Sequence, residues 1–361
     1  MRIFIMCAKS IHAKPFEKLM GKIWSTKGIK TVTMIIVTGG AGFIGSNLVN
    51  ALNQLGEEHI LIVDHLGTGE KWKNLRDLRF LDFETKENFI CKAEKGLFGN
   101  DVSAVFHLGA CSSTTEKDAD YLIQNNYEYS RRLATIYAEK PRTRFIYASS
   151  AATYGSGAQG YSDKPEPGSY LQPLNMYGYS KHLFDCWAHK TGFLKRSVGL
   201  KYFNVFGPNE YHKGPMRSVA IRAYGQAKRS GIISLFKSYL PNYADGEQRR
   251  DFIYVKDAVK VTLFFLGRPE SNGLFNVGTG EANTFNRLAS SVLSALKIPN
   301  HIEYVDMPSG LDKRYQYYTC AELEKLKSVG YQGKFYNLEE AVQDYILNYL
   351  EKEPDCEMLE T

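Results

Sequence analysis

The chain has 361 residues, of which 43% are hydrophobic and 23% are charged. These proportions are typical of a soluble globular protein, and the length allows one large domain or two domains in close contact. No apolar stretch approaches the roughly 18 residues that a membrane-spanning helix needs. The composition therefore argues against an integral membrane protein, and we expect no membrane partner.

The net charge of +6 belongs to the first 33 residues, which carry seven Lys or Arg and one acid. The rest of the chain has 38 basic and 38 acidic side chains, and this balance argues against a nucleic-acid partner. The basic segment lacks the continuous apolar core of a secretory signal. We expect residues 1–33 to be a disordered or non-native N-terminal extension, with a basic organelle-targeting or membrane-touching tail as the alternative.

The six cysteines are scattered along the chain and include no Cys-x-x-Cys pair. Isolated thiols of this kind indicate the reducing environment of the cytoplasm and argue against a disulfide framework or a zinc site. We therefore expect a cytoplasmic protein that has no bound metal and no catalytic cysteine.

The first predicted element is a buried parallel strand at residues 35–38, followed by a glycine-rich turn and by apolar residues at helical spacing. The glycines of the turn are Gly39, Gly40, Gly42 and Gly45. They fit the G-x-G-x-x-G fingerprint, or its variant with a longer first gap, in which the backbone approaches a pyrophosphate at a helix N-terminus. A second strand at 60–63 ends in Asp64, where an acid that binds the ribose of a dinucleotide is expected.

Further strands are predicted at 79–81, 102–108 and 144–149, with a long helix from 118 to about 139. Alternation of strands and helices as far as residue 204 indicates an α/β fold with a doubly wound parallel sheet, in which ligands bind at the carboxyl ends of the strands. From 207 to 250 the pattern gives way to glycine, proline and basic residues. Such a segment is typical of a loop region that closes over a bound substrate. It contains one predicted helix, near 218–228.

The later predicted elements are a strand followed by a helix, a short strand and two helices, at 252–266, 273–277, 285–296 and 338–350. We therefore predict a Rossmann-like dinucleotide-binding domain of residues 34–204 plus about 252–277. A smaller mixed α/β substrate-binding domain comprises 205–251 plus about 278–350, and 351–361 form a tail.

A Tyr/Lys pair and two serines suggest oxidation chemistry. Tyr177 and Lys181 are four residues apart and share one face of a helix if Tyr177 lies in its first turn. A lysine there lowers the pKa of a phenol from about 10, and the phenol can then remove a hydroxyl proton during hydride transfer. Ser149 and Ser150 end a strand, where a hydroxyl would orient the reacting oxygen. Taken singly, an incidental Tyr/Lys pair or a serine that caps a turn is the simpler interpretation.

The order of glycine turn, serine strand and Tyr-x-x-x-Lys, with the stretches 202–208 and 250–257 after it, resembles the extended short-chain dehydrogenase/reductase family. The resemblance extends from residue 34 to about 350. Members are mostly epimerases, dehydratases and reductases of nucleotide-linked sugars. The sugar-nucleotide 4,6-dehydratases carry an Asp-Glu pair where this chain has Ala151 and Ala152, which disfavours dehydration.

Four stretches, 109–116, 149–155, 175–181 and 212–214, are more similar to one branch, the ADP-L-glycero-D-manno-heptose 6-epimerases. The first and last are the specific ones. The resemblance implies inversion at C-6 of ADP-D-glycero-D-manno-heptose, by transient oxidation and re-reduction with a tightly bound NADP, or NAD, for lipopolysaccharide inner-core synthesis. It also implies a homo-oligomer, since pentamers are known in this branch.

This branch is expected to use two acid/base groups, because one side chain cannot easily serve both faces of a carbonyl. By resemblance Tyr177 is one and Lys213 is the other, while Ser150 and Lys181 complete the catalytic set. Lys213 can act as a base only if burial or neighbouring positive charge lowers its pKa. A solvated loop lysine or a phosphate-binding cation is the alternative for this residue.

The cofactor contacts that the resemblance implies are Gly39, Gly42, Phe43, Ile44, Gly45, Asp64, His65, Lys71, Lys86, Leu108, Gly109, Ala110, Cys111, Ser112, Asn125 and Lys181. The implied substrate contacts are Ser150, Asn204, Val205, Lys213, Arg250 and Tyr315. An acid at Asp64 favours the ribose of NAD, whereas Lys71 and Lys86 suit the 2′-phosphate of NADP. We favour NADP.

Two alternatives remain open. A UDP-hexose 4-epimerase, or another nucleotide-sugar short-chain dehydrogenase, shares Tyr-x-x-x-Lys but has no need of Lys213. A non-catalytic dinucleotide-binding sensor is less favoured, because such relatives usually lack the tyrosine or the lysine. The segment 237–248 is longer than in compact members, so its contacts with the nucleotide are not assigned.

Overall fold

The computed structural model describes residues 33–99, 101–164, 171–308 and 315–352. The predictions for the N-terminal extension and for the tail therefore lie almost wholly outside the described residues. Within them, no helix is both long enough and apolar enough to cross a bilayer.

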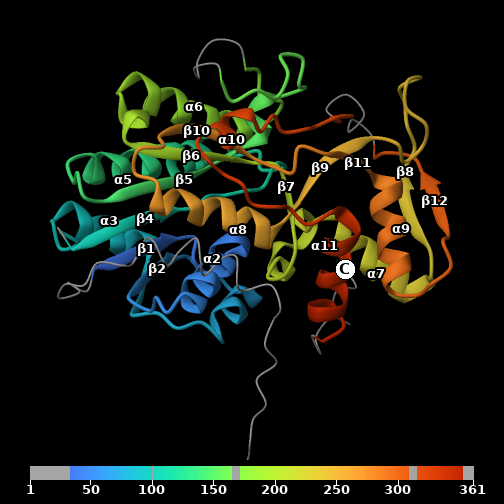
Figure 1. Ribbon diagram of the computed structural model, residues 1–361, viewed down its shortest axis with the longest axis horizontal. Coiled ribbons are helices and arrows are strands. Elements are labelled where there is room, and N and C mark those ends of the chain that lie inside the picture. The colour runs from blue at the N-terminus through green and yellow to red at the C-terminus, as the bar shows by residue number, and fades with distance from the viewer. Residues whose placement is uncertain (1–32, 100, 165–170, 309–314, 353–361) are drawn as a thin grey trace, which may run out of the picture.

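The centre of the molecule is a seven-stranded sheet in the order β10-β6-β5-β4-β1-β2-β3 (Figure 1). Its strands are β1 Met34–Thr38, β2 Ile60–Asp64, β3 Asp82–Thr85, β4 Val102–His107, β5 Arg144–Ser150, β6 Ser197–Tyr202 and β10 Gly273–Val277. Every neighbouring pair runs parallel. The strand order reverses between β1 and β4, so the predicted doubly wound α/β sheet is confirmed, with the switch point where such folds bind ligands.

Helices cover both faces of this sheet, because its strands are buried on both sides. Ile35 and Val37 of β1 share one apolar cluster with helices α2 (Phe43–Gln54) and α8 (Val255–Phe264). Ile36, which points to the other face, belongs to a second cluster. That cluster includes residues of α3, α5 and α6, which are Lys86–Glu94, Tyr129–Ala138 and Met176–Lys190.

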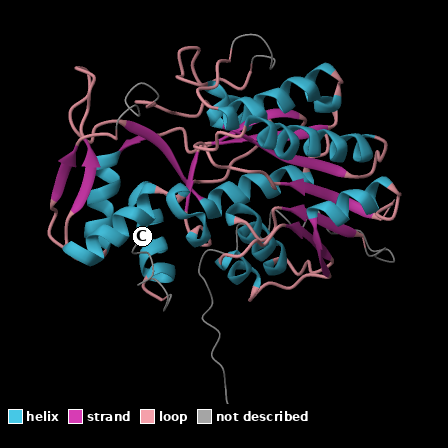
Figure 2. Ribbon diagram, turned by 180° about the vertical axis from the view of Figure 1, so that it is seen from behind, coloured by secondary structure: helices cyan, strands magenta, loops and turns pink. Residues whose placement is uncertain are grey.

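A smaller lobe lies to the right of the sheet in Figure 1. Strands β7, β9 and β11 (Asn204–Phe206, Arg249–Tyr254 and Ala282–Thr284) form a three-stranded sheet in the order β11-β9-β7. Strands β8 and β12 (Ile233–Phe236 and Ile302–Val305) form a parallel pair, seen at the outer end of the lobe in Figures 1 and 2. The helices of the lobe are α7 Val219–Ser230, α9 Phe285–Ala295 and α11 Leu338–Tyr345.

Shorter helical segments connect these elements. The 3-10 turns are η1 Glu70–Leu75, η3 Ala151–Tyr154, η4 Phe193–Lys195, η5 Tyr211–Met216 and η6 Phe265–Gly267. The remaining segments are α4 Ala119–Leu122, α10 Glu324–Ser328 and two π-helical stretches, η2 Ile123–Glu128 and η8 Ile346–Leu350. The predicted long helix 118–139 is thus present as α4, η2 and α5 in succession.

Two strand predictions need correction. The third strand is 82–85 and not 79–81, because the backbone N–H of Arg79 donates to the side chain of Asn53 and that of Leu81 donates to Ile60, ahead of the ladder. The strand that begins near residue 252 pairs with β7 and β11 and not with the large sheet. The sequence predicts that residues 252–277 belong to the Rossmann-like domain. Within that segment, β10 is a strand of the seven-stranded sheet and α8 packs against it.

The glycine turn between β1 and α2 brings three backbone segments into close contact. Gly39 has φ +72°, and a Cβ atom there would lie 2.6 Å from the backbone N of Gly109. A Cβ atom on Gly45 would lie 2.0 Å from the carbonyl O of Gly39. Since no side chain fits at either position, the first turn of α2 packs directly on the end of β1.

Gly45→Ala is expected to lower the free energy of unfolding by at least about 3 kcal/mol, because the clash is with backbone that cannot move aside. Chemical denaturation of the variant and of the wild type measures this loss. Gly69→Ala is the control, since nothing lies within 4 Å of its Cβ position, and its effect should stay within about 0.5 kcal/mol. Equal stabilities for the two variants would contradict the packing described here.

Candidate active site

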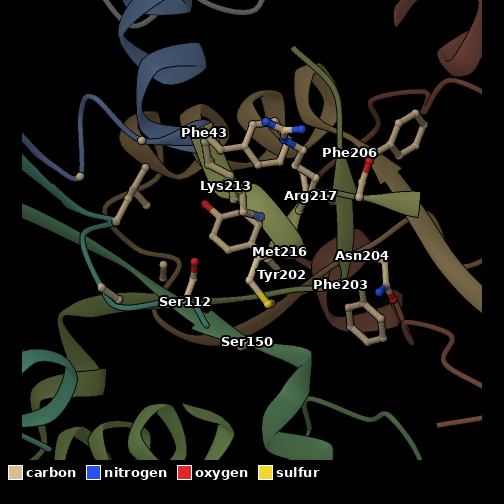
Figure 3. Close-up of a pocket in the computed structure, with 18 of the residues that line it drawn as sticks. Phe43, Ser112, Ser150, Tyr202, Phe203, Asn204, Phe206, Lys213, Met216 and Arg217 are labelled. Atoms are coloured by element: carbon tan, nitrogen blue, oxygen red, sulfur yellow. The ribbon is translucent and has the colours of Figure 1, made fainter. Parts of the chain in front are cut away.

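A cavity of about 450 Å³ lies at the switch point of the large sheet, where the strand ends face the smaller lobe. Figure 3 draws 18 of the residues that line it and labels ten of them. The sequence-predicted residues in its wall are Gly39, Gly42, Phe43, Ile44, Gly45, Asp64, Lys71, Leu108, Gly109, Ala110, Ser112, Ser150, Tyr177, Lys181, Asn204, Val205 and Lys213. Predicted cofactor, substrate and catalytic positions therefore share one space.

The wall formed by the glycine turn suits a phosphate group. Helix α2 begins at this wall with Gly42 as its N-cap residue, which contributes no side-chain cap, and no acid lies in its first turn. Backbone N–H groups and the positive end of the helix dipole thus face the cavity, and the glycines allow close approach. These residues fit the pyrophosphate of a dinucleotide.

Asp64 at the end of β2 has a nearly buried carboxylate. One oxygen accepts the backbone N–H of Ala41 at 2.9 Å, and the other accepts that of His65 at 2.7 Å. Lys71 forms an ion pair with Asp64 at 2.5 Å. The acid expected for a ribose is therefore partly neutralised by a lysine that lines the same cavity.

Six predicted contacts lie outside the wall of this cavity: His65, Lys86, Cys111, Asn125, Arg250 and Tyr315. Lys86 donates to Asn125 at 2.6 Å, and the two line a neighbouring cavity of about 210 Å³. Arg250 is buried with its guanidinium carbon 5.1 Å from the ring centre of Tyr315 and 5.6 Å from that of Phe285. Phe285 lines the main cavity, so Arg250 and Tyr315 lie directly behind its wall.

Tyr177 lies in the first turn of α6, as predicted, and the helix begins where Asn175 accepts the backbone N–H of Gly178. Burial raises the pKa of Tyr177, and a hydrogen bond with Ser150 lowers it. Lys181 donates to the carbonyl of Ala148 at 2.9 Å, and burial lowers its pKa to about 8. Of the two effects on Tyr177, the hydrogen bond with Ser150 is the one that favours the phenolate, and the predicted effect of Lys181 on the pKa of Tyr177 stays a prediction.

The two serines at the end of β5 have different partners. Ser149 donates to Asp185 at 2.7 Å beneath the cavity, and Tyr147 donates to the same carboxylate at 2.9 Å. Asp185 is fully buried, and the ammonium group of buried Lys201 lies 3.6 Å from it. This network fixes Ser149, while Ser150 remains beside Tyr177.

Lys213 approaches the cavity from the turn η5, with its ammonium 5.3 Å from the ring centre of Phe43 (Figure 3). Burial lowers its pKa, and the charge of Glu210 opposes that effect. Burial also lowers the pKa of neighbouring His212 to about 4, so this imidazole is neutral at pH 7. The direction of this pKa shift is the one that a base at Lys213 requires.

Sequence reasoning did not select several residues of the cavity wall: Ala148, Tyr202, Phe203, Phe206, His212, Met216, Arg217, Ser218, Val219, Ala220, Arg222, Phe252, Phe285 and Leu288. Arg217 and Arg222 matter most because they flank the N-terminus of α7, whose cap is Ser218. A serine cap between two arginines after a glycine- and proline-rich stretch is a sequence signal for an anion site at a helix start. The aromatic residues carry no comparable signal.

Comparison with known proteins agrees with this arrangement. Residues 35–278 match the NAD dependent epimerase/dehydratase family. The chain belongs to that family. Its membership also confirms the resemblance to the extended short-chain dehydrogenases, and it makes the chain an NAD(P)-dependent enzyme.

Family members with close sequence similarity include two curated relatives. A protein of Nitratidesulfovibrio vulgaris (strain DP4) is 52% identical over 317 residues, covering 88% of this chain and 98% of the relative. A protein of Fusobacterium nucleatum is 46% identical over 333 residues, covering 89% and 99%. Both are named ADP-L-glycero-D-manno-heptose-6-epimerase.

Solved structures of the epimerase family share the fold. The Helicobacter pylori ADP-L-glycero-D-manno-heptose-6-epimerase superposes with a TM-score of 0.71 at 26% identity, covering 88% of this chain and 96% of that one. A UDP-N-acetylglucosamine 4-epimerase from Methanobrevibacter ruminantium gives 0.73 at 26% identity, covering 89% and 99%. Since epimerases with different substrates superpose equally well, the fold alone does not select the sugar.

The buried carboxylate of Asp185 provides a test of the site's support in this epimerase. Asp185→Asn is expected to lower the free energy of unfolding by about 3–5 kcal/mol, because it leaves the buried ammonium of Lys201 unpaired. Urea denaturation measures the loss. The double variant Asp185→Asn/Lys201→Met should recover part of it, since the unpaired charge is then gone. A single-variant loss below about 1 kcal/mol would show that the pair is not required.

Proposed function

We propose that this chain is an ADP-L-glycero-D-manno-heptose 6-epimerase, which inverts C-6 of the heptose in ADP-D-glycero-D-manno-heptose. The observation that carries the proposal is that Tyr177 and Lys213 line the same cavity while coming from different elements, α6 and η5. The names of the relatives at 46% and 52% identity support the choice of substrate.

The chemistry that a bound NAD(P) supplies is removal and return of a hydride at one carbon. Gly39, Gly42 and the start of α2 would hold its pyrophosphate, and Asp64 with Lys71 would meet the adenosine ribose. The residues of the chain then handle the proton of the C-6 hydroxyl. Tyr177, hydrogen-bonded to Ser150, exchanges it on one face of the carbon.

Lys213 serves the opposite face. An amine that is neutral at the working pH can accept the proton, and burial of Lys213 moves its pKa in that direction. Phe43 lies beside its ammonium and helps to exclude water. After oxidation, the carbonyl must turn its other face to the dinucleotide before reduction, so the two groups act on the two epimers in turn.

The diphosphate of the substrate is expected near the N-terminus of α7. Arg217 and Arg222 line the cavity there, and N–H groups at the start of a helix bind anions. Arg250 packs on the rings of Phe285 and Tyr315. From behind Phe285, Arg250 and Tyr315 would bind the same end of the substrate. Asn204 and Val205, at the start of β7, face the sugar.

Incubation of the purified protein with ADP-D-glycero-D-manno-heptose, followed by chromatographic resolution of the two epimers, tests the function. Lys213→Met is expected to slow interconversion by about 10²- to 10⁴-fold because one face loses its acid/base group. Tyr177→Phe should have an effect of similar size, with the content of bound dinucleotide unchanged in both variants.

The alternative activity is tested in parallel with UDP-glucose and UDP-galactose. A UDP-hexose 4-epimerase would interconvert these two sugars and would retain that activity in Lys213→Met. Absence of turnover with every nucleotide sugar, in protein that retains dinucleotide, would instead favour a sensor.

NADP is the proposed cofactor because Lys71 compensates the charge of Asp64 and can also meet a 2′-phosphate. Lys71→Met should weaken NADPH binding by about 10- to 100-fold, the range for loss of a charged hydrogen bond, and NADH binding by less than about threefold. Isothermal titration of the cofactor-free protein measures both affinities. Lys92→Met, which removes a lysine paired with Glu84 away from the cavity, is the control. Equal losses for the two cofactors would contradict this role.

The proposal extends to the setting of the enzyme. A heptose epimerase of this kind would act in the cytoplasm in the synthesis of the lipopolysaccharide inner core, with ADP-heptose as its small-molecule partner. A homo-oligomer, by resemblance a pentamer, is the expected assembly, and sedimentation of the purified protein measures it.

A further inference from the structure

The segment that carries Lys213 runs from Gly207, after β7, to Ser218, the N-cap residue of α7. We refer to residues 207–218 as the Lys213 loop. It contains Asn209 at φ +73° and Gly214 at φ +52°, and its regular structure is limited to the 3-10 turn η5, which is kinked at Gly214. Side-chain contacts therefore help to fix the position of Lys213.

Glu210 is the fully buried acid of this loop. Its Oε1 accepts from the backbone N–H of Gly207 at 3.2 Å and from the hydroxyl of Ser218 at 2.8 Å. Its Oε2 accepts the backbone N–H of Ser218 at 2.5 Å. One carboxylate thus joins the first and last residues of the Lys213 loop.

The same residue also reaches two further parts of the molecule. The hydroxyl of Tyr345 in α11 donates to Oε1 at 3.2 Å, which ties the loop to a helix near the end of the described chain. The backbone carbonyl of Glu210 accepts the N–H of Lys213 at 3.1 Å. Glu210 therefore holds both the loop and the turn from which the lysine extends.

The outer side of the loop is attached to the cofactor-binding side of the cavity. Asn47 of α2 donates to the carbonyl of Pro208 at 2.9 Å, and Asn74 donates to that of Asn209 at 3.1 Å. The side chain of Asn209 donates to Ser46 at 2.9 Å. These bonds attach one side of the Lys213 loop to α2 and η1. The bonds of Glu210 hold the two ends of the loop together.

We propose that Glu210 is a positioning residue for the reaction: its buried carboxylate closes the Lys213 loop and holds the Lys213 amine in the cavity. The inference rests on the proposed function, in which Lys213 is an acid/base group. Glu210 is not itself a residue of the cavity wall, but it bonds to Ser218, which is. It acts through the geometry of the loop.

Glu210→Gln tests this role with almost no change in side-chain volume. Every contact of the carboxylate is with an N–H or O–H donor, so an amide NH₂ in place of one oxygen opposes a donor and releases one end of the loop. The kcat for epimerisation is expected to fall by about 10- to 100-fold, the effect of a displacement near 1 Å at a reacting group, while KM changes by less than about threefold. Bound dinucleotide should remain at the wild-type level.

Asp257→Asn is the matched control, because Asp257 of α8 is also a fully buried carboxylate and accepts the N–H of Tyr336 at 2.7 Å. It lies outside the cavity wall. It should lower the melting temperature without a specific loss of kcat. If Asp257→Asn reproduced the kcat loss of Glu210→Gln, the loss would reflect general destabilisation and the proposal would be overturned.

A double-mutant cycle separates action through Lys213 from any other effect. In the Lys213→Met background, single-turnover reduction of the bound dinucleotide on the face served by Tyr177 reports the remaining chemistry. Adding Glu210→Gln there should slow it by less than about threefold, since the residue through which it acts is gone. An equal factor in both backgrounds would overturn the proposal.

Tyr345→Phe is the second variant if Glu210→Gln does not fold, because it removes one donor to the Glu210 carboxylate. It should lower kcat by a smaller factor than Glu210→Gln, and that factor should shrink in the Lys213→Met background. An equal loss in both backgrounds would overturn the proposal.

A chemical readout tests the position of Lys213 whatever the substrate proves to be. Acetic anhydride labelling at about pH 10, where even an ordinary lysine is partly neutral, reports mainly access to the amine. Mass spectrometry should find Lys213 acetylated about tenfold faster in Glu210→Ala than in the wild type, with exposed Lys92 as internal reference. An unchanged rate would overturn the positioning role. A faster rate in a protein that does not interconvert the heptose epimers would retain the role and reject the proposed function.

Discussion

Loss of water around the cavity determines which groups can carry charge, and the rest of the site depends on it. Burial lowers the pKa of Lys181 and of Lys213 and raises that of Tyr177. Lys213 must be neutral to accept a proton and Tyr177 must be able to lose one, so burial favours the first role and opposes the second. The hydrogen bond between Ser150 and Tyr177 acts against the effect of burial on Tyr177, and the charge of Glu210 acts against its effect on Lys213. The site therefore depends on a small number of polar contacts that balance the effects of burial.

The sheet provides the second condition, since it places groups from distant parts of the chain at one edge. Parallel strands all present their carboxyl ends on the same side, so Asp64 and Ser150 come together although 86 positions separate them in the sequence. Helix α6 and the Lys213 loop then add residues to the wall of the same cavity. The smaller lobe adds arginines at the start of α7. Each element can be explained locally, but only the sheet brings them together.

Much of the large sheet could be predicted from the sequence because its inner strands are continuous apolar runs with clear turns. Strand β3 was misplaced since it lies at an edge and is mostly polar and exposed. Strand β9 has three charged residues followed by the apolar run Phe252–Tyr254, and nothing in that pattern says which sheet it joins. Pairing between distant strands depends on tertiary packing, which local sequence does not encode.

The candidate site, like the fold, could be predicted from the sequence only in part. The glycine turn, Tyr177 and Lys181 have short motifs with fixed spacing, and most residues implied by resemblance lie in the cavity wall. The partners of these residues were not foreseen: Lys71 on Asp64, Asp185 beneath Ser149, and Glu210 behind Lys213. Such contacts join positions that no motif links, so they become visible only in three dimensions.

The contact between Tyr345 and Glu210 links the reactive loop to a helix near the end of the described chain. During synthesis the ribosome releases the dinucleotide-binding strands first and helix α11 long afterwards. A partly made polypeptide could therefore fold its sheet and accept a dinucleotide while the lysine loop still lacked its inner anchor. Competence for inversion would arrive only after helix α11 has folded against the loop.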